Sequence, residues 1–425
     1  MFKKKETLVT AFALFSLFFG AGNLILPPLL GFHSGNQWFI ITLGFCLSAM
    51  VIPLLGIMAH AKLQGSLVDF GTKVSPTFSL FYAFLIYVIA IALPGPRTAS
   101  VTHEMAIQPY WEISSWVTSS IYFTLVFVFA MNRSKIVDIL GKILTPAIIL
   151  ILLFVIGIII FSFPFEFGTI EINSPFTNGI LEGYQTFDAI GAVVVGGVII
   201  ISINLKHTTA SYNDKKSLIR NAGWLAGLAL FFIYLGLIVS GALVHSIFDS
   251  DITRTALLSG LAKQSLGNIG NLFLSILVGI ACFTTAVGIV TGTADFVRSR
   301  FNDSPLAYTI TAIIGSVLGI LMGQFNVGYI IAVALPSLMF IYPITIILIL
   351  LNVVPDKYAS PLVFKVVTIT TILFSIPDFL GSISAIAPST NTFSWIPLQQ
   401  FSLGWVLPAC LAFVLTNVFM NSKKT

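Results

Sequence analysis

Charged side chains are scarce in this sequence. Only 9% of its 425 residues are Asp, Glu, Lys or Arg, whereas 57% are hydrophobic. An ordinary globular domain carries about 25% charged residues. This number of charged side chains is too small to cover the surface of a water-soluble protein of this length. Lipid must therefore be the solvent for most of the chain. The composition therefore predicts an integral membrane protein.

Cysteine is also rare, with three residues in the chain. Cys46, Cys282 and Cys410 lie singly within apolar stretches, and none belongs to a CxxC pair. This spacing excludes a disulfide framework and a zinc site of the usual kind. We expect the three thiols to pack as small hydrophobic side chains.

The motifs of soluble enzymes and of nucleic-acid-binding proteins are absent too. The sequence contains no P-loop, no GxSxG, no HExxH and no His/Cys cluster. Its net charge of +5 is spread thinly, without a basic stripe or interleaved aromatics, which excludes a nucleic-acid partner. The longest loops, 162–180, 246–266 and 381–401, are too short for an inserted domain, and no obligatory protein partner is evident. Function must therefore reside within the membrane.

Long apolar stretches dominate what is present. A membrane-spanning helix needs about 20 mostly apolar residues. The first stretch follows MFKKKE and is longer than the apolar core of a signal peptide, so we expect it to be retained as a span. We predict an all-α membrane protein of about twelve spans, at residues 7–30, 38–59, 77–105, 114–131, 138–161, 181–205, 222–246, 267–294, 306–322, 327–351, 362–380 and 402–420.

The positive charges predict the orientation of these spans. If both termini are cytoplasmic, all of the 21 lysines and arginines except Arg97, Arg254 and Lys263 fall on the cytoplasmic side. Cytoplasmic loops of membrane proteins carry this excess of basic residues. With one span more or fewer, loops rich in Lys and Arg would no longer alternate with loops that have few. The distribution of basic residues therefore supports both the number of spans and the cytoplasmic termini.

Two spans contain residues that break helices. The first reads FFGAGNLILPP, with Gly20, Gly22, Asn23 and a Pro-Pro pair inside one apolar stretch. The sixth reads GYQTFDAIGA and places Asp188 at membrane depth, where a carboxylate costs about 2.5–3.5 kcal/mol. Freed backbone groups must find partners in protein, water or ligand. The alternatives are a kinked or closely packed helix for the first span and an interfacial or capping carboxylate for the sixth.

The positions of the two breaks indicate an inverted repeat. Because five is an odd number, a second unit of five spans begins on the opposite side of the membrane, and spans one and six then correspond. The predicted units are 1–161 for spans one to five, 181–351 for spans six to ten, and 362–420 for two C-terminal spans. Substrates of such proteins bind at the midplane between the broken helices.

Two further stretches carry polar groups. Span eight reads ACFTTAVG, and the hydroxyls of Thr284 and Thr285 with a carbonyl one turn earlier are oxygen ligands that suit a hard cation such as Na⁺. The alternative is that each threonine bonds a carbonyl of its own helix. In span three, Pro94, Pro96 and Arg97 indicate either an outer gate or vestibule, or a helix end whose arginine reaches the interface.

With these residues, the sequence resembles the bacterial branched-chain amino acid:cation symporters, the BrnQ-type carriers. FFGAGNLILPP, ALPGPRTASV, GYQTFDAIGA and ACFTTAVG carry the resemblance, which extends over nearly the whole chain. It implies the leucine-transporter fold with its 5+5 inverted repeat. It also implies Na⁺-coupled uptake of leucine, isoleucine and valine at a bacterial inner membrane.

The resemblance also implies which residues bind. The stretch Gly20, Ala21, Gly22 and Asn23 matches the unwound part of span one, and Phe187, Asp188, Ala189, Ile190 and Gly191 form the facing break. Asn23 resembles a ligand of a Na⁺ beside the substrate. The carbonyls of Ser16, Phe19 and Ala281 and the hydroxyls of Thr284 and Thr285 resemble the ligands of a second Na⁺.

Other functions remain open from the sequence. A transporter of the same fold could carry another amino acid or couple to H⁺. A channel or an intramembrane enzyme is a remote alternative, because neither a selectivity filter nor a catalytic constellation at helical spacing is present.

Overall fold

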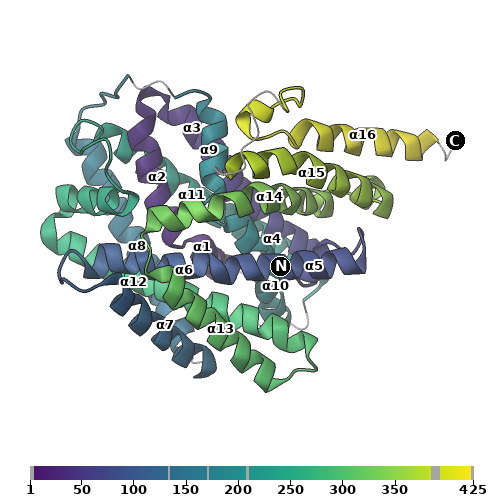
Figure 1. The fold of residues 1–425 in the computed structure, drawn as a ribbon, viewed down its shortest axis with the longest axis horizontal. Helices are drawn as coiled ribbons and strands as arrows, with labels where there is room; N and C mark the ends of the chain where they lie inside the picture. Colours follow the sequence, from purple (N-terminus) through teal and green to yellow (C-terminus); the bar gives the residue numbers. More distant parts are fainter. Residues whose placement is uncertain (1–3, 133–134, 170–171, 207–209, 384–392, 423–425) are drawn as a thin grey trace.

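The computed structural model describes residues 4–132, 135–169, 172–206, 210–383 and 393–422. Within these residues the regular structure is entirely helical, with α-helices α1 to α16 and short 3₁₀ or π turns (Figure 1). Each of the twelve predicted spans coincides with one helix or with a helix interrupted by a turn. We number these membrane segments 1 to 12 in chain order.

Segments 1 to 5 precede the long polar loop that ends near residue 174. They are α1 (Lys4–Phe18) with α2 (Ala21–Ser34); α3 (Trp38–Cys46), a π turn (Leu47–Val51) and α4 (Ile52–Leu63); α5 (Pro76–Ala92), α6 (Pro94–Thr102) and a π turn (His103–Ile107); α7 (Ser115–Asn132); and α8 (Lys135–Ser162).

Segments 6 to 12 follow that loop. They are α9 (Pro175–Tyr184) with α10 (Asp188–Lys206); α11 (Tyr212–Leu243); α12 (Arg254–Arg300); α13 (Pro305–Gly323); α14 (Val327–Val353); α15 (Pro361–Ser382); and α16 (Val406–Ser422). Short 3₁₀ turns occupy Gly35–Gln37, Leu67–Phe70, Asp356–Tyr358 and Gln399–Phe401.

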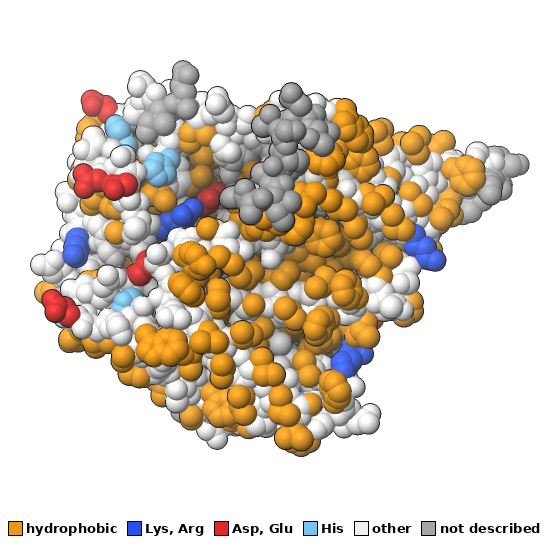
Figure 2. All heavy atoms as spheres, in the orientation of Figure 1, with side chains coloured by type: hydrophobic (Ala, Val, Ile, Leu, Met, Phe, Trp, Pro, Cys, Tyr) orange, Lys and Arg blue, Asp and Glu red, His pale blue; other side chains and the backbone are white. Residues whose placement is uncertain are grey.

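Length and composition agree with a membrane protein. Among the described residues, eight helical stretches are long and apolar enough to cross a bilayer, and Pro146–Ser162 and Val406–Met420 are shorter apolar helices. One of the eight, Ala21–Leu63, contains α2 together with all of segment 2. Figure 2 shows hydrophobic side chains over most of the visible surface, with charged ones gathered towards the left and right ends. A belt of exposed apolar side chains is the surface that lipid solvates.

Loops predicted to lie on the same side of the membrane contact one another. At one end, Lys62 and Lys73 pair with Asp356 at 3.1 and 3.2 Å, and this proximity holds the pKa of Asp356 below its usual value. At the other end, Ser115 donates to the Gln324 carbonyl at 2.7 Å. These contacts are those that an alternating path of twelve spans requires.

Helix packing repeats with a period of five segments. α1 and α2 of segment 1 pack on segment 7, just as α9 and α10 of segment 6 pack on segment 2. Segment 8 packs on segment 4 and segment 3 on segment 9 in the same way. This correspondence is that of a 5+5 inverted repeat. Segments 11 and 12 lie outside it, because α15 packs on α14 and α16 on α15 (Figure 1).

One loop contains more structure than the sequence indicated. Residues 246–266 were expected to be a loop, but α12 begins at Arg254. The Thr253 hydroxyl accepts the N–H of Ala256 and caps this helix, and Gly267, with φ of 70°, separates it from the membrane span. The low hydropathy of this helix hid it from a search for apolar stretches.

Candidate functional site

Segment 1 is broken about halfway along its length. α1 ends at Phe18 and α2 begins at Ala21, with Gly20 in an extended conformation between them. The Gly20 N–H donates to the side-chain oxygen of Asn23 at 3.1 Å, which caps the second half-helix. Pro27 and Pro28 do not cause the break, since both lie within α2. The prediction of a broken helix is confirmed, but the expected unwound stretch is shifted. The interruption lies at Phe19–Gly20, and Ala21, Gly22 and Asn23 form the first turn of α2 because Asn23 caps that helix through Gly20.

Segment 6 is broken at residues 185–187, earlier than expected, since Asp188, Ala189, Ile190 and Gly191 already belong to α10. α9 ends at Tyr184 and α10 starts at Asp188, and Phe187 has a φ of 63°. A residue with a side chain in the left-handed region costs about 1–3 kcal/mol and persists only where its surroundings enforce it. The Thr186 hydroxyl accepts the N–H of Asp188 at 3.2 Å and caps α10.

Asn23 joins the two breaks. Its side-chain N–H group donates to the Asp188 carboxylate at 2.5 Å and to the Tyr234 hydroxyl at 2.5 Å. The Tyr234 hydroxyl also donates to Asp188, at 3.4 Å. Asn23 is 1% exposed, Asp188 5% and Tyr234 0%. Because buried polar groups are costly unless hydrogen-bonded, this network fixes segments 1, 6 and 7 relative to one another.

Arg97 of α6 reaches the same place. It is 4% exposed, which excludes the interfacial position that the sequence left open. Its Nη1 donates to the carbonyl of Gln185 at 2.6 Å. The guanidinium carbon lies 5.1 Å from the centre of the Phe187 ring, in cation–π geometry. Segment 3 thus contributes a charged side chain to the break in segment 6.

The predicted threonine pair lies on α12 and is half-buried. The Thr284 hydroxyl donates to the Ala281 carbonyl at 2.9 Å, and the Thr285 hydroxyl donates to the same carbonyl at 3.0 Å. Both hydroxyls thus bond a carbonyl of their own helix, which is the alternative that the sequence left open, and the three oxygens lie within one turn of α12. α12 packs on α2, whereas α1, which carries Ser16 and leads to Phe19, packs mainly on α11.

The other predicted residues surround the Asn23–Asp188 contact. Ala21 and Gly22 are buried in the first turn of α2. Ala189 and Ile190 are buried in the first turn of α10, and the Ala189 N–H donates to the Tyr342 hydroxyl at 3.3 Å. A Cβ atom built on Gly191 would meet nothing within 4 Å, so space is open beside this turn.

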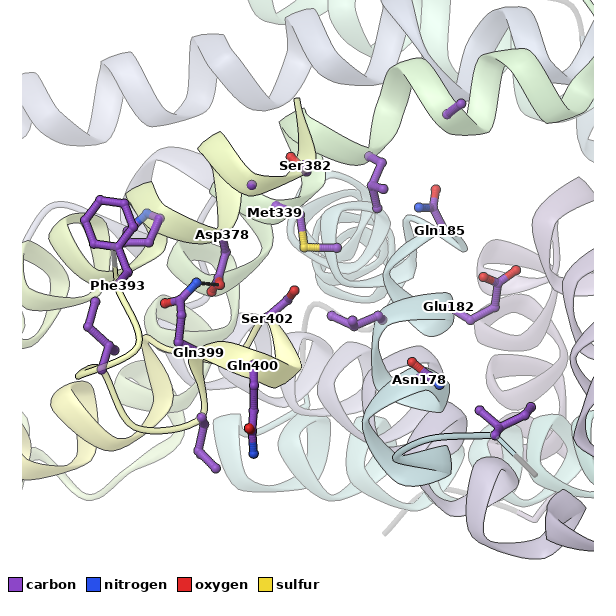
Figure 3. A pocket seen from close by; sticks show the side chains of 18 of the residues that line it. Asn178, Glu182, Gln185, Met339, Asp378, Ser382, Phe393, Gln399, Gln400 and Ser402 are labelled. Atoms are coloured by element: carbon purple, nitrogen blue, oxygen red, sulfur yellow. Dashed lines mark hydrogen bonds between the residues drawn. The ribbon is translucent and has the colours of Figure 1, made fainter. Parts of the chain in front are cut away.

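A wide vestibule leads from one end of the molecule to the break in segment 6. Its volume is about 1130 Å³, and Gln185, the first residue of the break, is part of its wall. Figure 3 shows Asn178, Glu182 and Gln185 projecting from one side and Asp378 and Gln399 from the other. Two polar contacts line it, Arg254 to Glu182 at 2.8 Å and Gln399 to Asp378 at 2.6 Å.

Sequence reasoning missed the two tyrosines of this site. Tyr234 and Tyr342 are fully buried, in α11 and α14, and each bonds a residue at the start of α10. Both lie in apolar stretches whose pattern gives no sign of a polar partner. A buried tyrosine hydroxyl needs a hydrogen-bond partner. In the sequence, that requirement is the only sign that these two tyrosines could belong to a polar site.

Comparisons with known proteins agree with this geometry. The family model described as branched-chain amino acid transport protein matches residues 3–423. The branched-chain amino acid transport system 2 carrier protein of Pseudomonas aeruginosa is 32% identical over 97% of this chain and 95% of its own length. The branched-chain amino acid permease BraB of Bacillus subtilis is also 32% identical, over 99% of this chain and 97% of its own length.

Solved structures share the fold at low sequence identity. Mhp1 in an inward-facing conformation has a TM-score of 0.62 at 11% identity and covers 97% of this chain and 91% of its own. MhsT in complex with L-phenylalanine has a TM-score of 0.55 at 15% identity and covers 97% of both chains. The fold is therefore the leucine-transporter fold, as the sequence predicted, and the protein is a multi-pass membrane transporter rather than an enzyme. With matches along its whole length, the chain belongs to the branched-chain amino acid transport protein family.

Proposed function

We propose that this protein imports leucine, isoleucine and valine across a bacterial inner membrane by symport with Na⁺. The observation that carries the proposal is the meeting of two helix breaks at the buried Asn23–Asp188 contact, three residues along the chain from Gln185, which lines a wide vestibule. Alternating access needs such a site, reached from one side at a time, between two broken helices.

The substrate would lie between the breaks. Backbone N–H groups in the first turn of α2 would face the substrate carboxylate, as helix N-termini bind anions. Those of Asp188 and Ala189 in α10 already bond Thr186 and Tyr342. Carbonyls of the stretch from Phe187 to Gly191, with the Asp188 carboxylate, would receive the ammonium group. The open space beside Gly191 would admit an aliphatic side chain. One methylene in an apolar pocket is worth only about 1–3 kcal/mol, so the three branched substrates should compete with one another.

Na⁺ is the proposed coupling ion, with H⁺ as the alternative. Ala281, Thr284 and Thr285 offer three oxygens in one turn, and the carbonyls of Ser16 and Phe19 would complete the site. A Na⁺ at Asn23 is less favoured, because its side-chain oxygen already accepts from Gly20. One Na⁺ moving down about 100 mV supplies roughly 2.3 kcal/mol. That free energy supports about fortyfold accumulation at 1.4 kcal/mol per decade.

Uptake by proteoliposomes tests this proposal. Labelled leucine should accumulate when Na⁺ is high outside, and replacing Na⁺ with K⁺ should abolish accumulation. Unlabelled isoleucine and valine should compete, and lysine and glutamate should not, because a second ionised group would be buried without a partner. Uptake that follows a pH gradient and ignores Na⁺ would identify H⁺ as the coupling ion. Lysine competing as well as valine would rule out the branched-chain assignment.

A further inference from the structure

A buried positive charge lies beside both helix breaks. Arg97 is 4% exposed, and among the described residues its Nε has no hydrogen-bond partner although the atom is buried. Its Nη1 is satisfied by a neutral carbonyl, that of Gln185. Removing a guanidinium from water costs several kcal/mol unless an anion and further hydrogen bonds compensate. The side chain is therefore placed to receive an anionic group.

No carboxylate of the described residues lies within ion-pair distance of Arg97. The ion pairs that the structure shows include those of Lys62 and Lys73 with Asp356 and of Arg254 with Glu182, and none of them involves Arg97. Asp188 adjoins Phe187, whose ring faces the guanidinium, but its carboxylate bonds Asn23 and Tyr234 instead of Arg97. A guanidinium and a carboxylate, both buried and not paired with each other, thus flank the break in segment 6.

We propose that Arg97 and Asp188 form a receptor for a zwitterion, in which Arg97 binds the α-carboxylate of the amino acid and Asp188 binds its α-ammonium. This inference rests on the proposed function and deepens it, since it assigns the carboxylate to a side chain in segment 3. A zwitterion brings no net charge into the membrane and gives each buried ion its counter-charge. An analogue that lacks one charge leaves one of the two buried ions unpaired, so it binds weakly.

Gly22 provides the space for the guanidinium. A Cβ atom on this residue would lie 2.7 Å from Nη2 of Arg97 and 3.4 Å from the Cα of Thr186. Since the backbone of the second break cannot yield easily, a methyl group there must displace the guanidinium. The glycine of segment 1 therefore positions the arginine of segment 3 against segment 6.

Leucine and leucinamide separate the role of Arg97 from a structural one. Leucinamide keeps the ammonium and the side chain but replaces the carboxylate with a neutral amide. We expect the wild-type protein to bind leucine about 100-fold more tightly than leucinamide, the usual effect of a buried charge pair. In Arg97→Gln this ratio should fall below about tenfold, with leucinamide bound at least as well as by the wild type. Arg97→Lys should restore part of the preference.

The measurement is the ligand-dependent rise in the unfolding temperature of the purified protein, which needs no ion gradient. Arg298→Gln, at a half-buried arginine in the last turn of α12, is the matched control and should leave the ratio unchanged. Asp188→Asn should weaken the binding of leucine. It should leave the binding of 4-methylpentanoate, which has no ammonium group, unaffected.

A second variant covers the case in which Arg97→Gln does not fold. Gly22→Ala should lower the leucine-to-leucinamide ratio, whereas Gly157→Ala, whose Cβ would meet nothing within 4 Å, should not. The zwitterion receptor would be overturned if the leucine-to-leucinamide affinity ratio were unchanged in a variant that folds. It would also be overturned if the variant lost affinity for both ligands equally. A wild-type protein that binds none of leucine, isoleucine and valine would instead overturn the proposed function.

Discussion

At Asn23 a single side chain holds two discontinuous helices together. Its oxygen caps α2 through Gly20, and its N–H group binds Asp188 and Tyr234 from two other segments. Because the side chain uses both its donor and its acceptor, a substitution here disturbs three elements at once. Any rearrangement of the two breaks during transport must exchange these hydrogen bonds for others.

The Tyr234 hydroxyl offers a mild test of this network. Tyr234→Phe removes one buried hydroxyl and keeps the ring, which packs on Phe45 with centroids 5.2 Å apart. We expect leucine uptake to fall by about tenfold and the protein to lose about 1 kcal/mol of stability, the usual net value of one hydrogen bond. Initial uptake rates and the unfolding temperature are the two measurements. Uptake at the wild-type rate would show that the hydroxyl has no part in the site.

The threonines of segment 8 permit a test of the coupling ion. Thr284→Val with Thr285→Val removes two oxygens and nearly preserves shape. If these hydroxyls bind Na⁺, the Na⁺ concentration for half-maximal leucine uptake should rise at least about tenfold, equivalent to 1.4 kcal/mol. Thr311→Val, at a hydroxyl that bonds its own helix in α13, is the matched control. An unchanged Na⁺ dependence would mean that the pair serves only its own helix.

Residues within a helix break were predictable because they violate the rules of a membrane helix. Gly20, Asn23 and Asp188 all stand out in apolar stretches, and the structure brings them to one place. Tyr234 and Tyr342 do not stand out, because their rings are ordinary in a membrane span. Their roles depend on partners that are distant in sequence, so only the fold identifies them.

At the scale of elements, close contacts between backbones hold the half-helices in position. A Cβ on Gly31 of α2 would lie 1.8 Å from the Ile238 carbonyl oxygen of α11, and one on Gly44 of α3 would lie 1.9 Å from that of Phe176 in α9. Small residues allow such approach between membrane helices. Segment 1 is thus fixed to segment 7, and segment 6 to segment 2, by the same device in each repeat.

Adding one methyl group to such a contact tests its importance. Gly31→Ala should destabilise the protein by about 1–3 kcal/mol or more, because the obstacle is backbone that cannot turn aside. Gly223→Ala, in α11 with nothing within 4 Å of its Cβ, is the control and should be neutral or slightly stabilising. The unfolding temperatures of the two purified variants give the comparison. Equal unfolding temperatures would contradict the proposed close packing.

Helix ends were more difficult to predict than helix positions. Segments 2 and 3 contain π turns at Leu47–Val51 and His103–Ile107, and α12 extends well before its apolar stretch. Hydropathy detects the part of a helix that contacts lipid, whereas hydrogen bonding determines where the helix begins. The α12 extension is capped by Thr253 and held by a bond from Thr255 to Glu104, neither of which hydropathy registers.

The described part of the molecule has two polar ends, and the vestibule lies at one of them. Its walls come from segments 1, 2, 6, 8, 10 and 11 and from residues 393–402, all near the end that carries the Ser115–Gln324 contact. At the opposite end, Lys62 pairs with Asp356, Tyr212 donates to the Lys62 carbonyl, and a smaller pocket of about 440 Å³ is lined by Lys62 and Arg220. If the basic end is cytoplasmic, the wider vestibule faces the outside.

The orientation in the membrane is the last prediction. Basic residues concentrate at the end that contains Lys62 and Lys73, and such residues remain in the cytoplasm during insertion. A reporter that is active only in the cytoplasm should therefore be active when fused after the last residue of the chain and inactive when inserted within residues 163–168. The matched insertion within residues 301–304, at the basic end, should be active. Activity at both 163–168 and 301–304 would contradict the path of twelve spans, because an odd number of spans separates those two loops.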